Sequence, residues 1–163
     1  MTPKRMLELA AGLGDAKNRQ SVEDALTYLH PEMTLYSTAW GTVARGRDAN
    51  AAILRHFFAA YPDYNVAFEG HVADSETFVG WGTVRMTMAT GARDAGRLVP
   101  NGRRIELPVH IRMTFRDDLI FTEHFVCDLA QIAVQSGLSI DALYANVFGV
   151  RPGAPEPAEG RVA

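Results

Sequence analysis

The chain has 163 residues, one cysteine and a formal net charge of −3. This length suits one domain with a sizeable core, and the acidic balance argues against nucleic-acid partners or an anionic membrane surface, which need concentrated positive charge. Cys127 is alone, so no internal disulfide can form, and no stretch is long and apolar enough to span a bilayer. We therefore expect a soluble, cytoplasmic domain.

Two helices are predicted at the start of the chain. Pro3 suits the first turn of a helix, and Gly12 and Gly14 predict its end. Ser21 is a good N-cap for a second helix, which Pro31 terminates. Both segments space their apolar residues so that they share one helical face.

A short strand, a loop and a third helix follow. Residues 33–38 read as a strand, and Trp40 lies in a loop after it that contains glycines. Asp48 is expected to cap a helix over residues 49–61. That helix carries the heaviest apolar stripe of the chain: Ile53, Leu54, Phe57, Phe58 and Tyr61.

Antiparallel strands dominate the second half. Residues 64–72 and 77–89 read as strands, and the polar segment 91–102 predicts a long hairpin loop. Residues 104–115 alternate strictly between apolar and polar side chains, which is typical of a strand with one buried face. A polar turn at 116–118 then predicts a hairpin with a last strand.

After the last strand the apolar period becomes helical. Asp128 and Gln131 form a capping-box pattern, and Gly137 ends that helix. Arg151 to Ala163 is poor in apolar residues and predicts a disordered tail after a single domain over residues 1–150. Helices segregated from an antiparallel sheet indicate an α+β fold, and a twisted sheet wrapped over a long helix makes a cone with a small-molecule pocket at its mouth.

Several short segments between about residues 8 and 148 carry a family resemblance: His30-Pro31-Glu32, Gly46-Arg47-Asp48, Tyr61-Pro62-Asp63, Phe115-Arg116-Asp117 and Glu123-His124-Phe125. In this order they resemble the SnoaL-like polyketide cyclase branch of the nuclear-transport-factor-2-like superfamily. The resemblance implies a cone-shaped α+β fold, with a curved antiparallel sheet over N-terminal helices and a closing C-terminal helix. It also implies a ligand pocket inside the cone, frequent dimers, no metal and no organic cofactor.

The catalytic residues of that superfamily are not reproduced here. By spacing, the slot of the ketosteroid isomerase base falls on Ser37, and the histidine and aspartate slots of the cyclases fall on Ile111 and Phe125. His110 is one residue out of register with the histidine slot, so on a regular strand it faces the other side. The Arg-x-Asp pair of the limonene-epoxide hydrolases has Thr114 in place of the acid.

Glu123 and Asp128 are the acid–base candidates. If the apolar face of residues 104–115 lines the cone, Glu123 shares the inner face of the last strand with Phe121 and Phe125, where desolvation favours general acid–base use. The competing interpretation for Glu123 is a place at the sheet edge or an ion pair with an arginine. For Asp128 it is the helix cap alone.

The expected lining of the pocket is largely apolar: Ser37, Trp40, Phe57, Met86, Ile111, Met113 and Phe125. The function expected from the resemblance is a cofactor-free cyclase, isomerase or lyase that moves a proton in a small apolar organic molecule. The alternative is a non-catalytic ligand-binding or dimerising module of the same fold.

The opposite face of the sheet carries Trp81, Arg85, His110 and Arg112. These side chains form either a polar site or an outer face that is solvated or pairs with a second copy. Strict alternation favours the outer face. A tryptophan left exposed on an open sheet then predicts a homodimer through this surface.

Overall fold

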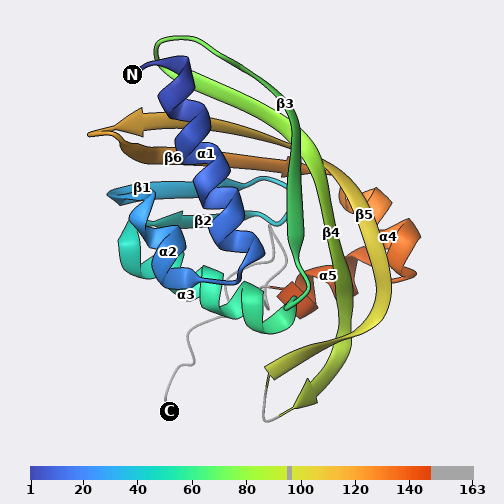
Figure 1. The fold of residues 1–163 in the computed structure, drawn as a ribbon. Helices are drawn as coiled ribbons and strands as arrows, with labels where there is room; N and C mark the ends of the chain where they lie inside the picture. The colour runs from blue at the N-terminus through green and yellow to red at the C-terminus, as the bar shows by residue number, and fades with distance from the viewer. Residues whose placement is uncertain (95–96, 148–163) are drawn as a thin grey trace, which may run out of the picture.

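The computed structural model describes residues 1–94 and 97–147. The elements run in this order: α1 (Pro3–Asn18), α2 (Val22–Thr27), β1 (Leu29–Ser37), β2 (Thr42–Arg45), α3 (Gly46–Ala60), β3 (Asn65–Ala73), β4 (Thr77–Asp94), β5 (Arg97–Arg116), β6 (Leu119–Cys127), α4 (Leu129–Ser136) and α5 (Ile140–Val147). The strands form one sheet in the order β2-β1-β6-β5-β4-β3, curved around α1 and α3 (Figure 1).

This arrangement is the α+β cone that the sequence predicts. All neighbouring strands are antiparallel except β1 and β6, which are parallel. The helix α1 packs mainly against β3, α3 against β1, and α4 against β5. Long strands β4 and β5 bend across the whole molecule, and the C-terminal helices lie at the end of the cone opposite the N-terminus (Figure 1).

The inner face of β5 supplies much of the core. Its alternate residues are almost completely buried: Ile105, Leu107, Val109, Ile111 and Met113. The alternation predicted for residues 104–115 is therefore confirmed. Burying one such side chain contributes about 1.5–3 kcal/mol, so this single strand face is a major source of stability.

The helix α1 continues to Asn18, so its predicted end at Gly12 and Gly14 is wrong. Close packing explains the two glycines. A Cβ at position 12 would overlap the ring of Tyr28, and one at position 14 would lie 3.3 Å from the ring of Phe68. The glycines therefore let other elements approach the helix, and packing outweighs their low helix propensity.

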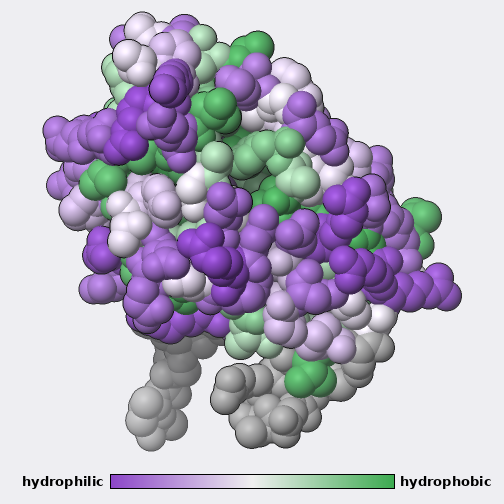
Figure 2. Space-filling view, in the orientation of Figure 1, coloured by the Kyte–Doolittle hydropathy of each residue, from purple (hydrophilic) through white to green (hydrophobic). Residues whose placement is uncertain are grey.

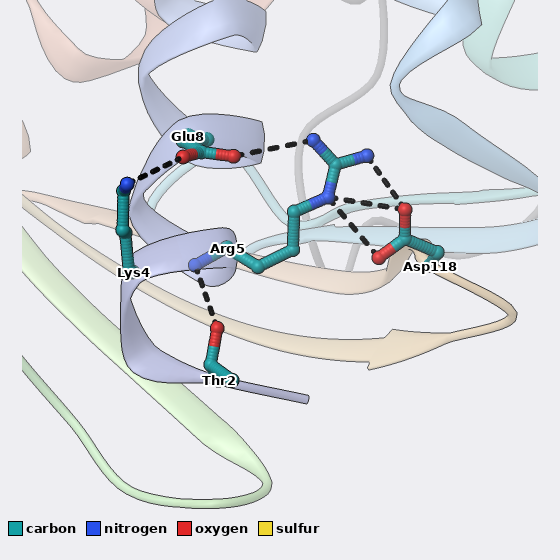
Figure 3. Close-up of polar contacts among 5 residues, drawn as sticks. All are labelled: Thr2, Lys4, Arg5, Glu8 and Asp118. Atoms are coloured by element: carbon teal, nitrogen blue, oxygen red, sulfur yellow. Dashed lines mark hydrogen bonds and ion pairs between the residues drawn. The ribbon is translucent and has the colours of Figure 1, made fainter.

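Polar contacts join the first turns of α1 to the turn between β5 and β6 (Figure 3). The Thr2 hydroxyl accepts a hydrogen bond from the Arg5 backbone N–H at 3.2 Å. The Arg5 guanidinium donates to both carboxylate oxygens of Asp118 at 2.6 to 3.1 Å, and Glu8 pairs with Arg5 and Lys4. These groups are exposed, so they position the helix more than they stabilise it.

The hairpin of β4 and β5 is longer than predicted. The strands reach Asp94 and begin again at Arg97, so the long loop predicted for residues 91–102 is wrong. Strand β2, which pairs with β1, was also not expected. Strand ladders are made by backbone groups, so polar side chains do not prevent pairing when the partner strand is in place.

The helix α3 begins earlier than predicted. Gly46, with φ at +78°, is its first residue, and the N-cap Arg45 makes no side-chain capping hydrogen bond. Asp48 lies in the first turn instead of at the cap, so that prediction is wrong. A carboxylate in the first turn still interacts favourably with the helix dipole.

Two further expectations concern the C-terminal tail and the absence of a membrane span. The predicted disordered tail, residues 151–163, lies outside the described residues. Within residues 1–94 and 97–147, no helix combines the length and the apolar character needed to cross a membrane.

The capping pattern at the start of α4 is confirmed. The Asp128 carboxylate accepts hydrogen bonds from the backbone N–H groups of Ala130 at 2.8 Å and Gln131 at 3.4 Å. Gly137 ends the helix with φ at +73°, a conformation that suits glycine. Asp128 is exposed, so its side chain is free of packing constraints that would complicate a substitution.

We predict that Asp128→Ala lowers the free energy of unfolding by about 1 kcal/mol, because the cap hydrogen bonds are lost. Asp128→Asn should leave stability nearly unchanged, since asparagine caps about as well as aspartate. Urea denaturation followed by circular dichroism measures both. Equal losses in the two variants would contradict the capping role.

Candidate functional site

The concave side of the sheet encloses an apolar hollow of about 720 Å³, counted out to its open mouth. Helix α3, strands β1, β4, β5 and β6, and helix α4 contribute to its wall. The apolar side chains are Leu35, Trp40, Ile53, Leu54, Phe57, Val84, Met86, Leu107, Phe125 and Ile132. The residues with polar groups are Lys17, Ser37, Thr42, Tyr64, Glu123 and Cys127. We call this space the main hollow.

A smaller hollow of about 360 Å³, also counted out to its open mouth, lies between α1 and β3 and reaches the inner face of β5. Figure 2 shows recessed apolar surface between α1 and β3, bordered by polar side chains. The two hollows share Lys17, Tyr64, Glu123 and Phe125 in their linings. These four residues therefore stand at the boundary between the two spaces.

An ion pair occupies that boundary. Glu123 lies on the inner face of β6, opposite Met113 of β5 and beside Leu35 of β1, and its side chain is 4% exposed. The Lys17 ammonium, near the end of α1, donates to both carboxylate oxygens at 2.9 and 3.1 Å. Burying a lone carboxylate is costly, and the lysine compensates that charge.

Sequence reasoning placed Glu123 among candidates but missed Lys17. The expected partner was an arginine, and the expected end of the first helix lay before Lys17. One signal was available: Lys17 follows Ala10 and Leu13 at helical spacing, so it is a cation on the apolar face of α1. A charged residue on a buried stripe needs a buried partner.

Burial controls the ionisation of two further groups at the main hollow. Burial, with the nearby charge of Glu123, raises the pKa of the Tyr64 hydroxyl well above its ordinary value. Burial, with the charge of Asp128 adding to it, raises the pKa of the Cys127 thiol to about 12. Both groups therefore stay protonated near neutral pH, so Cys127 is a poor nucleophile.

Two residues from the end of β1 and the following turn complete the wall. Ser37 is 6% exposed and pairs with Phe125 of β6 and Thr42 of β2. Trp40 is buried and packs edge-to-face against Tyr144, with ring centroids 6.3 Å apart. The Tyr144 hydroxyl in turn donates to a backbone carbonyl of the Trp40 turn at 2.8 Å.

The structure divides the residues expected at the site into three groups. The main hollow is lined by Ser37, Trp40, Phe57, Met86, Glu123 and Phe125. Ile111 and Met113 line the smaller hollow, together with Phe125. Asp128 is exposed and lines neither hollow, so its position supports the cap and not the acid–base role.

A β-bulge changes the expected face of Phe121. Thr114 pairs with Thr122, but Phe115 pairs with Ile120, so Phe121 is the extra residue on β6. Ile120 is fully buried, whereas the Phe121 ring lies under the Arg116 guanidinium, 3.6 Å from ring centroid to guanidinium carbon. The expectation that Phe121 shares the inner face with Glu123 is therefore wrong.

Trp81, Arg85, His110 and Arg112 lie on the outer face of the sheet. Trp81 is 38% exposed and pairs with His110 across β4 and β5. Arg85 forms an ion pair with Glu106 at 2.8 Å, and the Arg112 guanidinium lies 3.3 Å from His124 Nε2. Arg85 and Arg112 thus bond to neighbours on the convex side, and Arg85, His110 and Arg112 line neither hollow, whereas Trp81 also borders the smaller hollow.

Across residues 1–94 and 97–147, no group of three or more His, Cys, Asp or Glu side chains is placed to hold a metal ion. The polar groups at the wall of the main hollow are the Lys17–Glu123 ion pair, the hydroxyls of Ser37, Thr42 and Tyr64, and the Cys127 thiol.

A curved sheet closed by helices around an apolar hollow defines the nuclear-transport-factor-2-like class of proteins. Residues 11–123 match the SnoaL-like domain, and the chain belongs to this family. No curated protein matches the sequence.

Solved structures show the same fold. A protein from Jannaschia sp. CCS1 assigned to the SnoaL-like polyketide cyclases has a TM-score of 0.70 at 13% identity, covering 85% of this chain and 97% of that one. A Xanthomonas campestris protein assigned as a polyketide cyclase has a TM-score of 0.69 at 21% identity, covering 81% and 96%. A Catenulispora acidiphila protein with a ketosteroid isomerase-like fold has a TM-score of 0.70 at 16% identity, covering 86% and 98%.

The raised pKa of Cys127 leads to a labelling prediction. At pH 8, alkylation of Cys127 by iodoacetamide should be at least about a hundredfold slower in the folded protein than in the urea-unfolded chain, because the thiolate reacts and its population is suppressed. Mass spectrometry of timed samples measures both rates, and the chain has a single cysteine. Similar rates in the two states would show that the thiol is not desolvated.

Proposed function

We propose that the protein is a cofactor-free enzyme of the cyclase, isomerase or lyase type, which transfers a proton within a small apolar organic molecule bound in the main hollow. The observation that carries the proposal is the Lys17–Glu123 ion pair. It places a carboxylate that is 4% exposed at the wall of a largely apolar space. Paired, desolvated ionisable groups in a cleft are typical of catalytic sites.

In the proposed reaction, the Glu123 carboxylate takes a proton from a carbon next to a carbonyl group of the ligand. The negative charge then passes from the carboxylate to the carbonyl oxygen, which becomes an enolate. The Lys17 ammonium, already within hydrogen-bonding distance of Glu123, can stabilise that oxygen once its partner is neutral. The negative charge and the Lys17 cation that compensates it therefore stay within the same site during the transfer.

The fate of the enolate determines the reaction class. Return of the proton from Glu123 to another carbon gives an isomer. Attack of the enolate carbon on a second carbonyl closes a ring and forms an alkoxide, which takes the proton from Glu123. Expulsion of a group with its bonding electrons from the neighbouring carbon gives an alkene, and the expelled group takes the proton. Each outcome needs only the carboxylate, the ammonium and the walls of the hollow. The relatives assigned as polyketide cyclases favour ring-containing or polyketide-like substrates for this proposal.

The alternative is a non-catalytic ligand-binding module. The observation that favours it is the mutual neutralisation of Lys17 and Glu123, together with a serine, an isoleucine and a phenylalanine at the superfamily's catalytic slots, Ser37, Ile111 and Phe125. Such a protein would bind the ligand without exchanging its protons. The two functions are therefore separable by measuring proton transfer and binding independently.

We predict that the protein accelerates the exchange of the α-protons of 1-tetralone, a bicyclic ketone, with deuterium oxide. Glu123→Gln should abolish this acceleration, because the amide accepts no proton, and Lys17→Met should reduce it by about a hundredfold or more through loss of the enolate's cation. Proton nuclear magnetic resonance measures the exchange. Circular dichroism checks that each variant is folded.

The double variant Lys17→Met/Glu123→Gln serves as the stability control. Lys17→Met alone leaves a buried carboxylate without a partner and should be the least stable of the three. The double variant should recover stability and remain inactive. Exchange that survives in Glu123→Gln would exclude Glu123 as the base, and binding of 1-tetralone without exchange by the natural protein would favour the ligand-binding module.

We also propose that two copies pair through the outer face of the sheet. A row of registered residues crosses this face from Gly70 through Trp81 and His110 to Val126. Trp81 is 38% exposed and Val126 is 47% exposed, and arginines flank the row at positions 85 and 112. A self-complementary contact would remove this apolar surface from water, and tryptophan with arginine is typical of interfaces.

Trp81→Glu should therefore shift the protein towards monomer in sedimentation equilibrium, because it introduces a charge at the centre of the proposed contact. Val134→Glu is the matched control, since Val134 is 80% exposed on α4 and does not belong to the row of strand residues at the proposed contact. A natural protein that sediments as a monomer at micromolar concentration would refute the dimer.

A further inference from the structure

Ser37 carries a buried hydroxyl that the protein itself leaves unused. Its residue is 6% exposed, and its Oγ has no hydrogen-bond partner among the described residues. Gln20 Oε1 and the Tyr61 hydroxyl are also without partners within this part of the chain, but neither residue lines the main hollow. A buried hydroxyl without a partner is destabilising, so its presence at the wall of the main hollow points to a partner supplied by a ligand.

The register of the sheet places Ser37 close to the proposed base. Ser37 pairs with Phe125 of β6, and Leu35, two residues earlier on the same strand, pairs with Glu123. Ser37 and Glu123 therefore share the inner face as diagonal neighbours on adjacent strands. A carbonyl oxygen at the serine would leave its neighbouring carbon on the side of the carboxylate.

The surroundings of Ser37 restrict the ligand further. Most side chains that line the hollow are apolar, including Leu35, Trp40, Phe57 and Phe125. A ligand that matches them carries aromatic or alicyclic rings and one oxygen that accepts a hydrogen bond. The Lys17 ammonium is engaged by Glu123 in the resting protein, and among the hydroxyl groups at the hollow that of Ser37 is the one buried with no partner among the described residues.

From this geometry we infer that Ser37 donates a hydrogen bond to a ketone oxygen of the ligand and thereby selects cyclic ketones over hydrocarbons of the same shape. The inference rests on the proposed function for the main hollow and names its substrate class. Ser37 acts here as a binding and orienting residue: it holds the carbonyl group, while Glu123 and Lys17 carry out the proton transfer.

The test compares 1-tetralone with tetralin, which have the same bicyclic skeleton and differ in the carbonyl oxygen. Dissociation constants are measured by isothermal titration calorimetry for the natural protein and for Ser37→Ala. The serine-to-alanine change should weaken 1-tetralone binding about five- to tenfold, the effect of one neutral hydrogen bond, and leave tetralin binding within about twofold. Ser37→Thr, which keeps the hydroxyl, should restore the preference for 1-tetralone.

Ser136→Ala is the matched control. Ser136 is also a buried serine, but its Oγ accepts from the Leu138 N–H at 3.2 Å and lies 3.5 Å from the Ala133 carbonyl oxygen, and it lines neither hollow. This variant should melt at a lower temperature and bind both compounds normally. Ser37→Ala should melt no lower than the natural protein, because it removes a hydroxyl that has no partner.

Equal effects of Ser37→Ala on both compounds, or failure of the natural protein to prefer 1-tetralone, would overturn the inference. If a water molecule and not the ligand is the partner of the Ser37 hydroxyl, Ser37→Ala should affect the binding of both compounds equally. The binding measurements are independent of turnover. A ketone preference that depends on Ser37, without any deuterium exchange, would therefore support this inference and refute the catalytic proposal.

Discussion

The interior of the cone is organised around the ion pair of Lys17 and Glu123. It joins the end of the first helix to the middle of the last strand, two segments 106 residues apart in the sequence. Such a pair contributes little net stability, because desolvation offsets the attraction between the charges, but removing one partner typically costs about 3–5 kcal/mol. The position of α1 inside the sheet and the chemistry of the hollow therefore depend on the same contact.

Local backbone geometry makes that contact possible. Gly12 and Gly14 let α1 continue past close neighbours, so that the helix extends far enough to place Lys17 beneath the sheet. For Glu123, the partner of Lys17, the bulge at Phe121 determines the inward direction, because it shifts the alternation of the β6 residues that follow it. A strand without this bulge would turn either Glu123 or Ile120 to the opposite face.

Family membership explains the fold but leaves the chemistry to particular side chains. Relatives below 25% identity share the cone, and one fold can carry many functions. In this chain the polar groups at the main hollow are few, and most have a defined state: a carboxylate paired with a lysine, a protonated tyrosine, a protonated thiol and a serine hydroxyl with no partner among the described residues. This small set limits the mechanisms worth testing.

Local patterns in the sequence predict the α+β class, the buried face of residues 104–115 and the Asp128 cap, because periodicity and capping depend on residues close together in the chain. Contacts in the folded chain were needed to show that Lys17 pairs with Glu123, that Phe121 leaves the inner face, and that residues 91–94 and 97–102 extend a strand ladder. These features arise from contacts between segments far apart in sequence. Local preferences for turns and helix ends yield to such contacts when packing and backbone pairing are at stake.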